Sequence, residues 1–252
     1  MNVFDAIVLA GGPPDAVAAL EPGAYNKAFV RVGGVPLVTR TIAGLRASSR
    51  IDRVVAVAPP AAAADPALAA ASEVRGDGSR MIESLRSGLQ GFTEDALVVV
   101  AAADLPALDA RAVDEFVDAA LARDLDLAYA CLERRYHDVV YPEFPHTWAR
   151  LREGSFCGGG VVALRPRVLP RLAELLDALG NARKSPLRLA SLFGWDVLAR
   201  FALGRLTIAG AEERASRLIG ARAGAIRCTQ PQIALNVDRV DDVRRANLRF
   251  AS

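Results

Sequence analysis

Five apolar residues in a row, at positions 6–10, stand near the start of the chain and run directly into Gly11 and Gly12. An apolar run without alternation predicts a strand buried on both faces, as in a parallel sheet covered by helices. Glycine lacks a Cβ atom and tolerates positive φ, so consecutive glycine N–H groups can form a concave nest that binds an anion. The pattern therefore predicts either a phosphate-binding loop or a simple tight turn after this strand.

Two more predicted strands, at 53–58 with apolar residues from Val54 on and at 97–103, have the same character. Between and after these runs, apolar residues recur at helical spacing, from Pro36 to about residue 47 and from Asp109 to about residue 123. Strands alternating with helices predict an α/β fold with a parallel, doubly wound sheet. With 252 residues, of which 52% are apolar, we expect one domain over residues 1–252.

The composition excludes several classes of protein. The 31 basic and 29 acidic side chains leave a net charge of only +2, so nucleic acid is not an expected partner. Three separated cysteines and two histidines argue against a zinc site and against a disulfide framework. No apolar stretch reaches the length of a transmembrane helix. We therefore expect a cytoplasmic protein.

A carboxylate, Asp104, directly follows the third apolar run. In open α/β sheets ligands bind in the crevice at the carboxyl ends of the strands. Mg²⁺ typically takes one or two protein carboxylates and keeps several water molecules. The alternative is a helix cap, but Asp109 is better placed to cap the helix that follows. We therefore expect Asp104 to hold a divalent cation that carries substrate phosphates, with Lys27 as a compact cation over the same polyphosphate.

Two glycine-rich stretches are further candidates. In residues 76–88 a glycine-rich turn opens a helix that Ser79 is expected to cap, with Met81 among its inward residues. Gly158, Gly159 and Gly160 precede an apolar strand, which suits close approach of the backbone to a ligand. A plain βα loop and a flexible turn are the respective alternatives.

The remaining segments are less regular. Residues 133–154 are expected to form an arm over one side of the sheet, and residues 185–225 a helical insertion. The part at 185–206 mixes aromatic and basic residues. Packing over the second half of the sheet is favoured there over contact with a membrane surface or with a partner subunit, as in a homodimer. Residues 233–243 predict a short strand that ends in Asp238, followed by a terminal helix.

The order of these pieces resembles the MobA-like nucleotidyltransferases, the superfamily of molybdenum-cofactor guanylyl- and cytidylyltransferases and of sugar- or polyol-phosphate nucleotidylyltransferases. The residues that carry the resemblance are Leu9-Ala10-Gly11-Gly12, Asn26-Lys27-Ala28, Gly33-Gly34-Val35-Pro36-Leu37, Asp104-Leu105-Pro106 and Asn236-Val237-Asp238. It covers most of the chain. It implies a Rossmann-like, GT-A-type fold, in which a mostly parallel mixed sheet is sandwiched between helices. It also implies the reaction NTP + X-phosphate → NDP-X + pyrophosphate.

The resemblance also implies roles for single residues. Lys27, Asp104 and Asp238 would be catalytic, and the two carboxylates would bind Mg²⁺ or Mn²⁺. The nucleoside triphosphate would contact Leu9, Ala10, Gly11, Gly12 and Lys27, with Gly78, Arg80 and Ser84 at the base. Gly158, Gly159 and Gly160 would lie beside a phosphorylated small-molecule acceptor.

The chain departs from the family at one place. The family's loop commonly continues after its two glycines to an arginine beside the triphosphate, where this chain has Pro13-Pro14-Asp15. Either another cation such as Arg80 replaces that arginine, or the activity is weakened. A nucleotide-binding regulatory or scaffold protein of the same fold is therefore an alternative. A GT-A glycosyltransferase is a third hypothesis, although Leu105 and Pro106 deny Asp104 the usual D-x-D partner.

Overall fold

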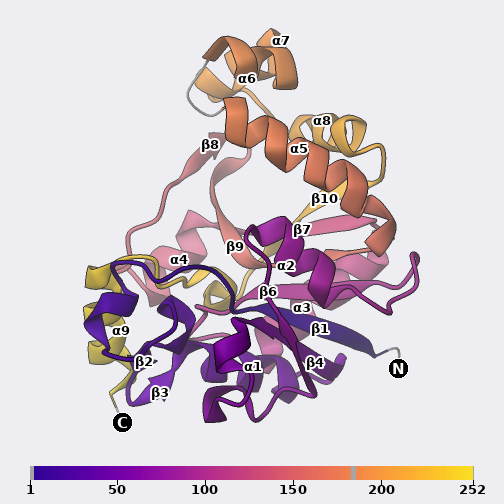
Figure 1. Ribbon diagram of the computed structural model, residues 1–252. Helices are drawn as coiled ribbons and strands as arrows, with labels where there is room; N and C mark the ends of the chain where they lie inside the picture. The colour runs from indigo at the N-terminus through magenta and orange to yellow at the C-terminus, as the bar shows by residue number, and fades with distance from the viewer. Residues whose placement is uncertain (1–2, 183–185, 252) are drawn as a thin grey trace.

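Within residues 3–182 and 186–251, which the computed structural model describes, eight strands form one sheet (Figure 1). These strands are β1 (Phe4–Leu9), β4 (Ile51–Ala58), β5 (Glu73–Gly76), β6 (Val98–Ala102), β7 (Leu127–Glu133), β8 (Ala149–Leu151), β9 (Gly154–Leu164) and β10 (Ala223–Cys228). Their order is β10-β7-β9-β6-β1-β4-β5, and β8 lies beside β9. Two short strands, β2 (Arg31–Val32) and β3 (Val35–Pro36), form a separate hairpin.

The sheet is mixed and mostly parallel. Strand β1 runs parallel to β4 and β6, β4 to β5, and β10 to β7. Only β9 and β8 introduce antiparallel pairs among these described strands, because β9 runs against β6, β7 and β8. The carboxyl ends of β1 and β6 therefore meet at one edge of the sheet. The expected α/β, Rossmann-like fold is confirmed.

Helices cover both faces of the sheet (Figure 1). They are α1 (Leu37–Ala47), α2 (Met81–Gly88), α3 (Ala110–Ala122), α4 (Arg134–Val140), α5 (Leu169–Ala182), α6 (Pro186–Phe193), α7 (Trp195–Ala202), α8 (Ile208–Ile219) and α9 (Val240–Phe250). Along β1 the side chains alternate between two apolar clusters. Ala6 and Val8 pack with α1 and α3, whereas Ile7 packs with α2, α5 and α8. Strand β1 is thus buried on both faces, as its sequence predicts.

Several local predictions need correction. The helix α2 begins after Arg80 and not after Ser79, because the Ser79 hydroxyl donates to the Glu83 carboxylate instead of capping the helix. Met81, expected to face inward, is 60% exposed. The three glycines at 158–160 lie inside β9 and not before it. The segment 133–154 contains α4 and the strand β8, which extends the sheet beside β9.

The C-terminal part differs most from expectation. No strand forms at 233–243, where the structure has a 3-10 turn at Pro231–Ala234, a loop and then α9. Strand β10 lies at the end of the predicted helical insertion. Within the described residues of 185–206, α6 and α7 project beyond α5 and do not cover the sheet (Figure 1). Ser185 lies outside the described residues.

The projecting helix α7 has no buried residue, and the exposed side chains of Trp195 and Phe201 lie on it. Contact of this region with a membrane surface or a second subunit remains a prediction. In the part of the chain that the structure describes, no helix combines the length and apolarity needed to cross a membrane.

Candidate active site

A cavity of about 600 Å³ lies at the carboxyl ends of β1 and β6, between the glycine loop, the start of α2 and β9. Its lining includes most residues that the sequence singles out, namely Leu9, Gly11, Gly12, Lys27, Gly78, Arg80, Ser84, Asp104, Gly159 and Gly160. Ala10 is buried behind the wall, and Gly158 lines a different cavity. Asp238 reaches this site through its contact with Lys27.

The Lys27 ammonium lies between two carboxylates, 2.5 Å from Asp104 Oδ2 and 2.6 Å from Asp238 Oδ1. These two oxygens therefore approach one common centre, although their residues lie 134 positions apart in the chain. The sequence prediction that both carboxylates meet at the edge of the sheet is consistent with this geometry.

Asn26 fixes the position of Lys27. Its side-chain oxygen accepts a hydrogen bond from Ala28 N at 2.9 Å and so caps the 3-10 turn at Lys27–Phe29. Its amide nitrogen donates to the carbonyl oxygens of Ala10 and Gly12, at 2.8 and 3.2 Å. This buried side chain thus ties the lysine turn to the glycine loop. Sequence reasoning gave Asn26 no role, although a capping residue directly before a short turn was the available signal.

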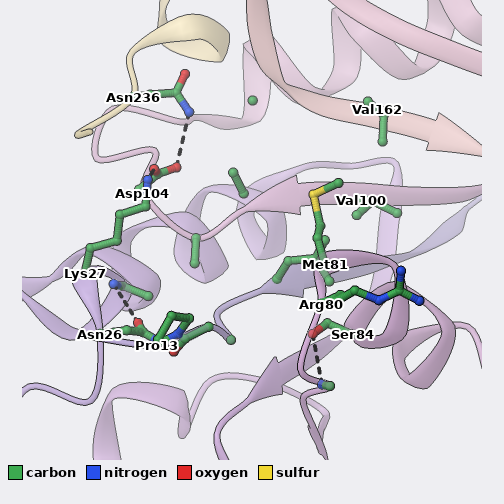
Figure 2. A pocket seen from close by; sticks show the side chains of 18 of the residues that line it. Pro13, Asn26, Lys27, Arg80, Met81, Ser84, Val100, Asp104, Val162 and Asn236 are labelled. Atoms are coloured by element: carbon green, nitrogen blue, oxygen red, sulfur yellow. Dashed lines mark hydrogen bonds and ion pairs between the residues drawn. The ribbon is translucent and has the colours of Figure 1, made fainter. Parts of the chain in front are cut away.

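Asp104 is the buried member of the pair, with only 4% of its side chain exposed. Its Oδ1 accepts a hydrogen bond from Asn236 Nδ2 at 3.2 Å (Figure 2). Its backbone oxygen accepts from Val237 N at 3.1 Å. These two bonds hold the loop before α9 against the end of β6, and they place Asp238 at the site without a strand.

The charges of this cluster depend on one another. Burial disfavours the ammonium form of Lys27, but Asp104 and Asp238 outweigh this effect and raise the pKa of Lys27 above its usual value. Lys27 is therefore a fixed cation at neutral pH. Burial raises the pKa of Asp104 above its ordinary value, against the opposing influence of the Lys27 ammonium. The buried carboxylate thus depends on Lys27 for its charge.

The glycine loop already holds an anionic side chain. Gly12 has φ of +106°, and its N–H donates to Asp77 Oδ2 at 2.9 Å. A Cβ atom at Gly11 would lie 2.5 Å from the Asp77 Cβ, so only glycine fits this contact. Sequence reasoning did not single out Asp77. Asp15, which occupies the place of the family's arginine, instead accepts hydrogen bonds from two backbone N–H groups of the turn that follows it.

The opposite end of the cavity is formed by the start of α2. Figure 2 shows Arg80 directed away from Lys27 and Asp104. Its guanidinium bonds to Glu83 at 3.2 Å and to Asp177 of α5 at 2.8 Å, so in this arrangement it does not replace the missing loop arginine. The buried Ser84 hydroxyl accepts from Gly78 N at 3.0 Å and fixes the turn before the helix.

The glycines of β9 allow close packing of the loop that carries Asn236. A Cβ atom at Gly160 would lie 3.0 Å from Asn236 Nδ2 and 2.6 Å from Leu105. A Cβ atom at Gly159 would lie 3.1 Å from the carbonyl oxygen of Ile233. These glycines therefore position the neighbour of Asp104. Their predicted contact with an acceptor stays a prediction.

Residues 6–190 of the chain match the MobA-like NTP transferase domain. The protein belongs to this family. A hypothetical transferase from Thermus thermophilus is 33% identical and has a TM-score of 0.84, over 96% of this chain and 99% of that one. The protein is therefore a nucleotidyltransferase, as the sequence resemblance implies.

Two more distant structures share the fold of this nucleotidyltransferase. One is 2-C-methyl-D-erythritol 4-phosphate cytidylyltransferase, also from Thermus thermophilus, with 16% identity, complete coverage of both chains and a TM-score of 0.57. The other is CMP:2-keto-3-deoxy-manno-octonic acid synthetase complexed with CTP, with 13% identity, coverage of 100% of this chain and 99% of that one, and a TM-score of 0.60.

The donor set of this nucleotidyltransferase fits a hard divalent cation. Among the described residues no group of three or more His, Cys, Asp or Glu side chains forms a metal cage. The two converging carboxylates, Asp104 and Asp238, already enclose a cation in the form of the Lys27 ammonium. Mg²⁺ and Mn²⁺ suit such a site, because oxygen ligands suit both ions and Mg²⁺ is usually held by one or two carboxylates with water and phosphate oxygens.

Proposed function

We propose that this nucleotidyltransferase transfers a nucleoside monophosphate unit from an NTP to a phosphorylated small molecule, with Mg²⁺ or Mn²⁺ as cofactor. An oxygen of the acceptor phosphate forms a bond to the α-phosphorus of the NTP. The bond from the α-phosphorus to the bridging oxygen breaks, and pyrophosphate leaves. The observation that carries this proposal is the convergence of Lys27, Asp104 and Asp238 beside the glycine loop.

Lys27 acts as a positioned cation in this proposal. Its raised pKa keeps it protonated, so it neutralises negative charge and does not accept a proton. Transfer of this kind depends mainly on positioning and charge neutralisation. Asn26 holds the lysine turn and the glycine loop in one unit, which fixes the charge relative to the phosphates.

Asp104 and Asp238 are the residues that would hold the divalent cation. When bound, the cation neutralises triphosphate charge and helps to orient the reacting groups. Asn236 maintains the orientation of the Asp104 carboxylate through its hydrogen bond to Oδ1.

Direct attack by the acceptor is favoured over a covalent enzyme intermediate. The three cysteines are free and buried. Burial raises the pKa of Cys131 to about 11 and that of Cys157 to about 12, so both are neutral thiols at physiological pH. A neutral thiol is a poor nucleophile. These free thiols also suit the cytoplasm, which we propose as the compartment.

A catalytically weak nucleotide-binding protein of the same fold is the second candidate. It is favoured by one observation, that Gly12 N–H and Arg80 are both bonded to carboxylates of the chain itself. Both would have to exchange these partners to bind a triphosphate.

Pyrophosphate release separates the two candidates. We would measure it with each of the four NTPs, against a panel of sugar, polyol and cofactor phosphates, with Mg²⁺, Mn²⁺ or a chelator. CTP comes first, because two structures with the same fold are described with CTP or as a cytidylyltransferase. Release that requires an acceptor and a divalent cation supports the transferase. Nucleotide binding without pyrophosphate release from any combination of NTP and acceptor supports the second candidate.

A further inference from the structure

A second cavity, of about 290 Å³, lies between α8 and the strands β7, β9 and β10. Tyr129 and Phe156 line it from the sheet, and Ala211 and Ala215 line it from the helix. Its volume is at the low end of the range for small-molecule sites, so it suits a part of a ligand.

The lining of this cavity is apolar and carries no unpaired charge among its described residues. Its one carboxylate, Glu212, is bonded to both terminal nitrogens of Arg123, at 2.8 and 3.0 Å, and to Ala225 N at 2.7 Å. The thiols of Cys131 and Cys157 are neutral, because burial raises their pKa to about 11 and about 12. An ionised phosphate would lose its hydration here without gaining a cation. The cavity therefore suits an uncharged apolar group.

The second cavity adjoins the nucleotide cavity across β9. Gly158 lines the second cavity, and the next residue, Gly159, lines the first. Tyr129 of the second cavity is the cross-strand partner of Val162, which lines the first. Cross-strand partners lie about 5 Å apart, so the walls of the two cavities adjoin at this pair of residues.

We propose that the phosphorylated acceptor carries an uncharged alkyl or aryl portion that binds in the second cavity. This inference rests on the proposed function, because the acceptor phosphate is assigned to the first cavity beside Lys27 and Asp104. The two cavities then divide recognition between them. The first takes the charged groups, and the second selects the acceptor by apolar contact, which distinguishes it from a bare polyol phosphate.

Binding of straight-chain alkyl monophosphates, from ethyl to octyl, tests the inference without turnover. We would measure each affinity by calorimetry, with inorganic phosphate as the reference. Each methylene that leaves water should tighten binding about fourfold until the second cavity is filled. Equal affinity along the series would overturn the proposal.

Ala211→Phe places a ring in the second cavity and should abolish the dependence on chain length, while inorganic phosphate binds as before. Ala209→Phe is the matched control, because Ala209 is exposed on the same helix. If the phenylalanine of Ala211→Phe prevents folding, Ala215→Leu fills the second cavity from another position. Unchanged chain-length dependence in the folded filled variants would overturn the proposal.

A second copy of the chain is the other candidate to occupy the second cavity. Sedimentation of the wild type and the same variants tests this. A wild-type dimer that Ala211→Phe dissociates would assign the cavity to a second copy of the chain and overturn the acceptor inference. The outcome of the NTP screen does not depend on the binding results with the alkyl monophosphates. Turnover with polyol phosphates and no chain-length effect leaves the proposed function standing and removes only the acceptor inference.

Discussion

The Lys27 ammonium lies 2.5 Å from the buried carboxylate of Asp104, and the same nitrogen contacts the exposed carboxylate of Asp238. Lys27 thus occupies the centre that a divalent cation bound by both carboxylates would also occupy. A buried charge needs a partner, because its hydration is lost on folding. Lys27 therefore has two roles in our proposal. It balances the negative charge of Asp104, and it neutralises the triphosphate. In this proposal a divalent cation would compete with Lys27 for the carboxylate of Asp104.

Lys27→Ala is expected to slow pyrophosphate release at least a hundredfold, because one preorganised charge contact typically contributes about 3 kcal/mol to lowering the barrier. From the sequence, this substitution is predicted to slow turnover far more than it destabilises the fold, since a loop lysine contributes little to packing. The structure adds a cost in stability, because the substitution leaves the buried carboxylate of Asp104 without a cationic partner. We expect unfolding in urea to show a loss of about 1–3 kcal/mol.

The double variant Lys27→Ala, Asp104→Asn provides the control. Because it removes the unpaired charge, the free energy of unfolding should return towards the wild-type value while activity stays low. If Lys27→Ala released pyrophosphate at the wild-type rate with the true substrate, Lys27 would have no catalytic role.

The stability loss of Lys27→Ala should depend on pH. Burial raises the pKa of Asp104, and without the opposing Lys27 ammonium it rises further. The native state then binds a proton at a higher pH than the unfolded state does, so stability falls as pH rises through the raised pKa of Asp104. The deficit relative to wild type should be largest at neutral and alkaline pH, and small below about pH 4, the pKa of an unfolded Asp. Urea unfolding across this range would show it, and a deficit independent of pH would contradict it.

Asp238→Asn should lower Mg²⁺-dependent turnover with little effect on stability. The side chain is 64% exposed, and such substitutions usually change stability by less than about 0.5 kcal/mol. It is not the cap of α9, since Arg239 holds that position. The sequence predicts equal or greater stability through relief of a like-charge pair, but Lys27 already lies between the two carboxylates. Asp241→Asn is the control, with a similarly exposed carboxylate three residues on.

Sequence patterns predict what local burial and spacing determine. The run at 6–10 and Asp104 at the end of β6 follow from strand burial and from the position of ligand sites in such sheets. The sequence predicts that a strand brings Asp238 to the site. In the structure, the hydrogen bonds of Asn236 and Val237 to Asp104 hold Asp238 at the site instead. These are contacts across more than a hundred residues, and no local pattern encodes them.

The position of α6 and α7 has a similar cause. An amphipathic pattern requires an apolar contact but does not specify the surface that supplies it. The same applies to Asp77, whose Gly-Asp-Gly context predicts a turn and not its contact with Gly12 on another loop.

Asp77→Asn is expected to tighten binding of the triphosphate. The Asp77 carboxylate accepts the Gly12 N–H that the proposed function assigns to phosphate, and its charge repels the same ligand. Removing the charge weakens a charge-assisted hydrogen bond that the triphosphate must replace. A hydrogen bond with a net worth of about 1 kcal/mol corresponds to about fivefold in affinity. We therefore expect a KM for the NTP about fivefold lower than that of the wild type.

Asp15→Asn is the matched control for this substitution. It makes the same change of charge in the loop after the glycines, but the Asp15 carboxylate accepts from Val17 and Ala18 within its own turn. A specific competition between Asp77 and phosphate predicts a lower KM for Asp77→Asn alone, whereas a general effect of net charge predicts the same shift in both. A higher KM in Asp77→Asn would contradict the competition and would instead make Asp77 a residue that binds the substrate or its cation.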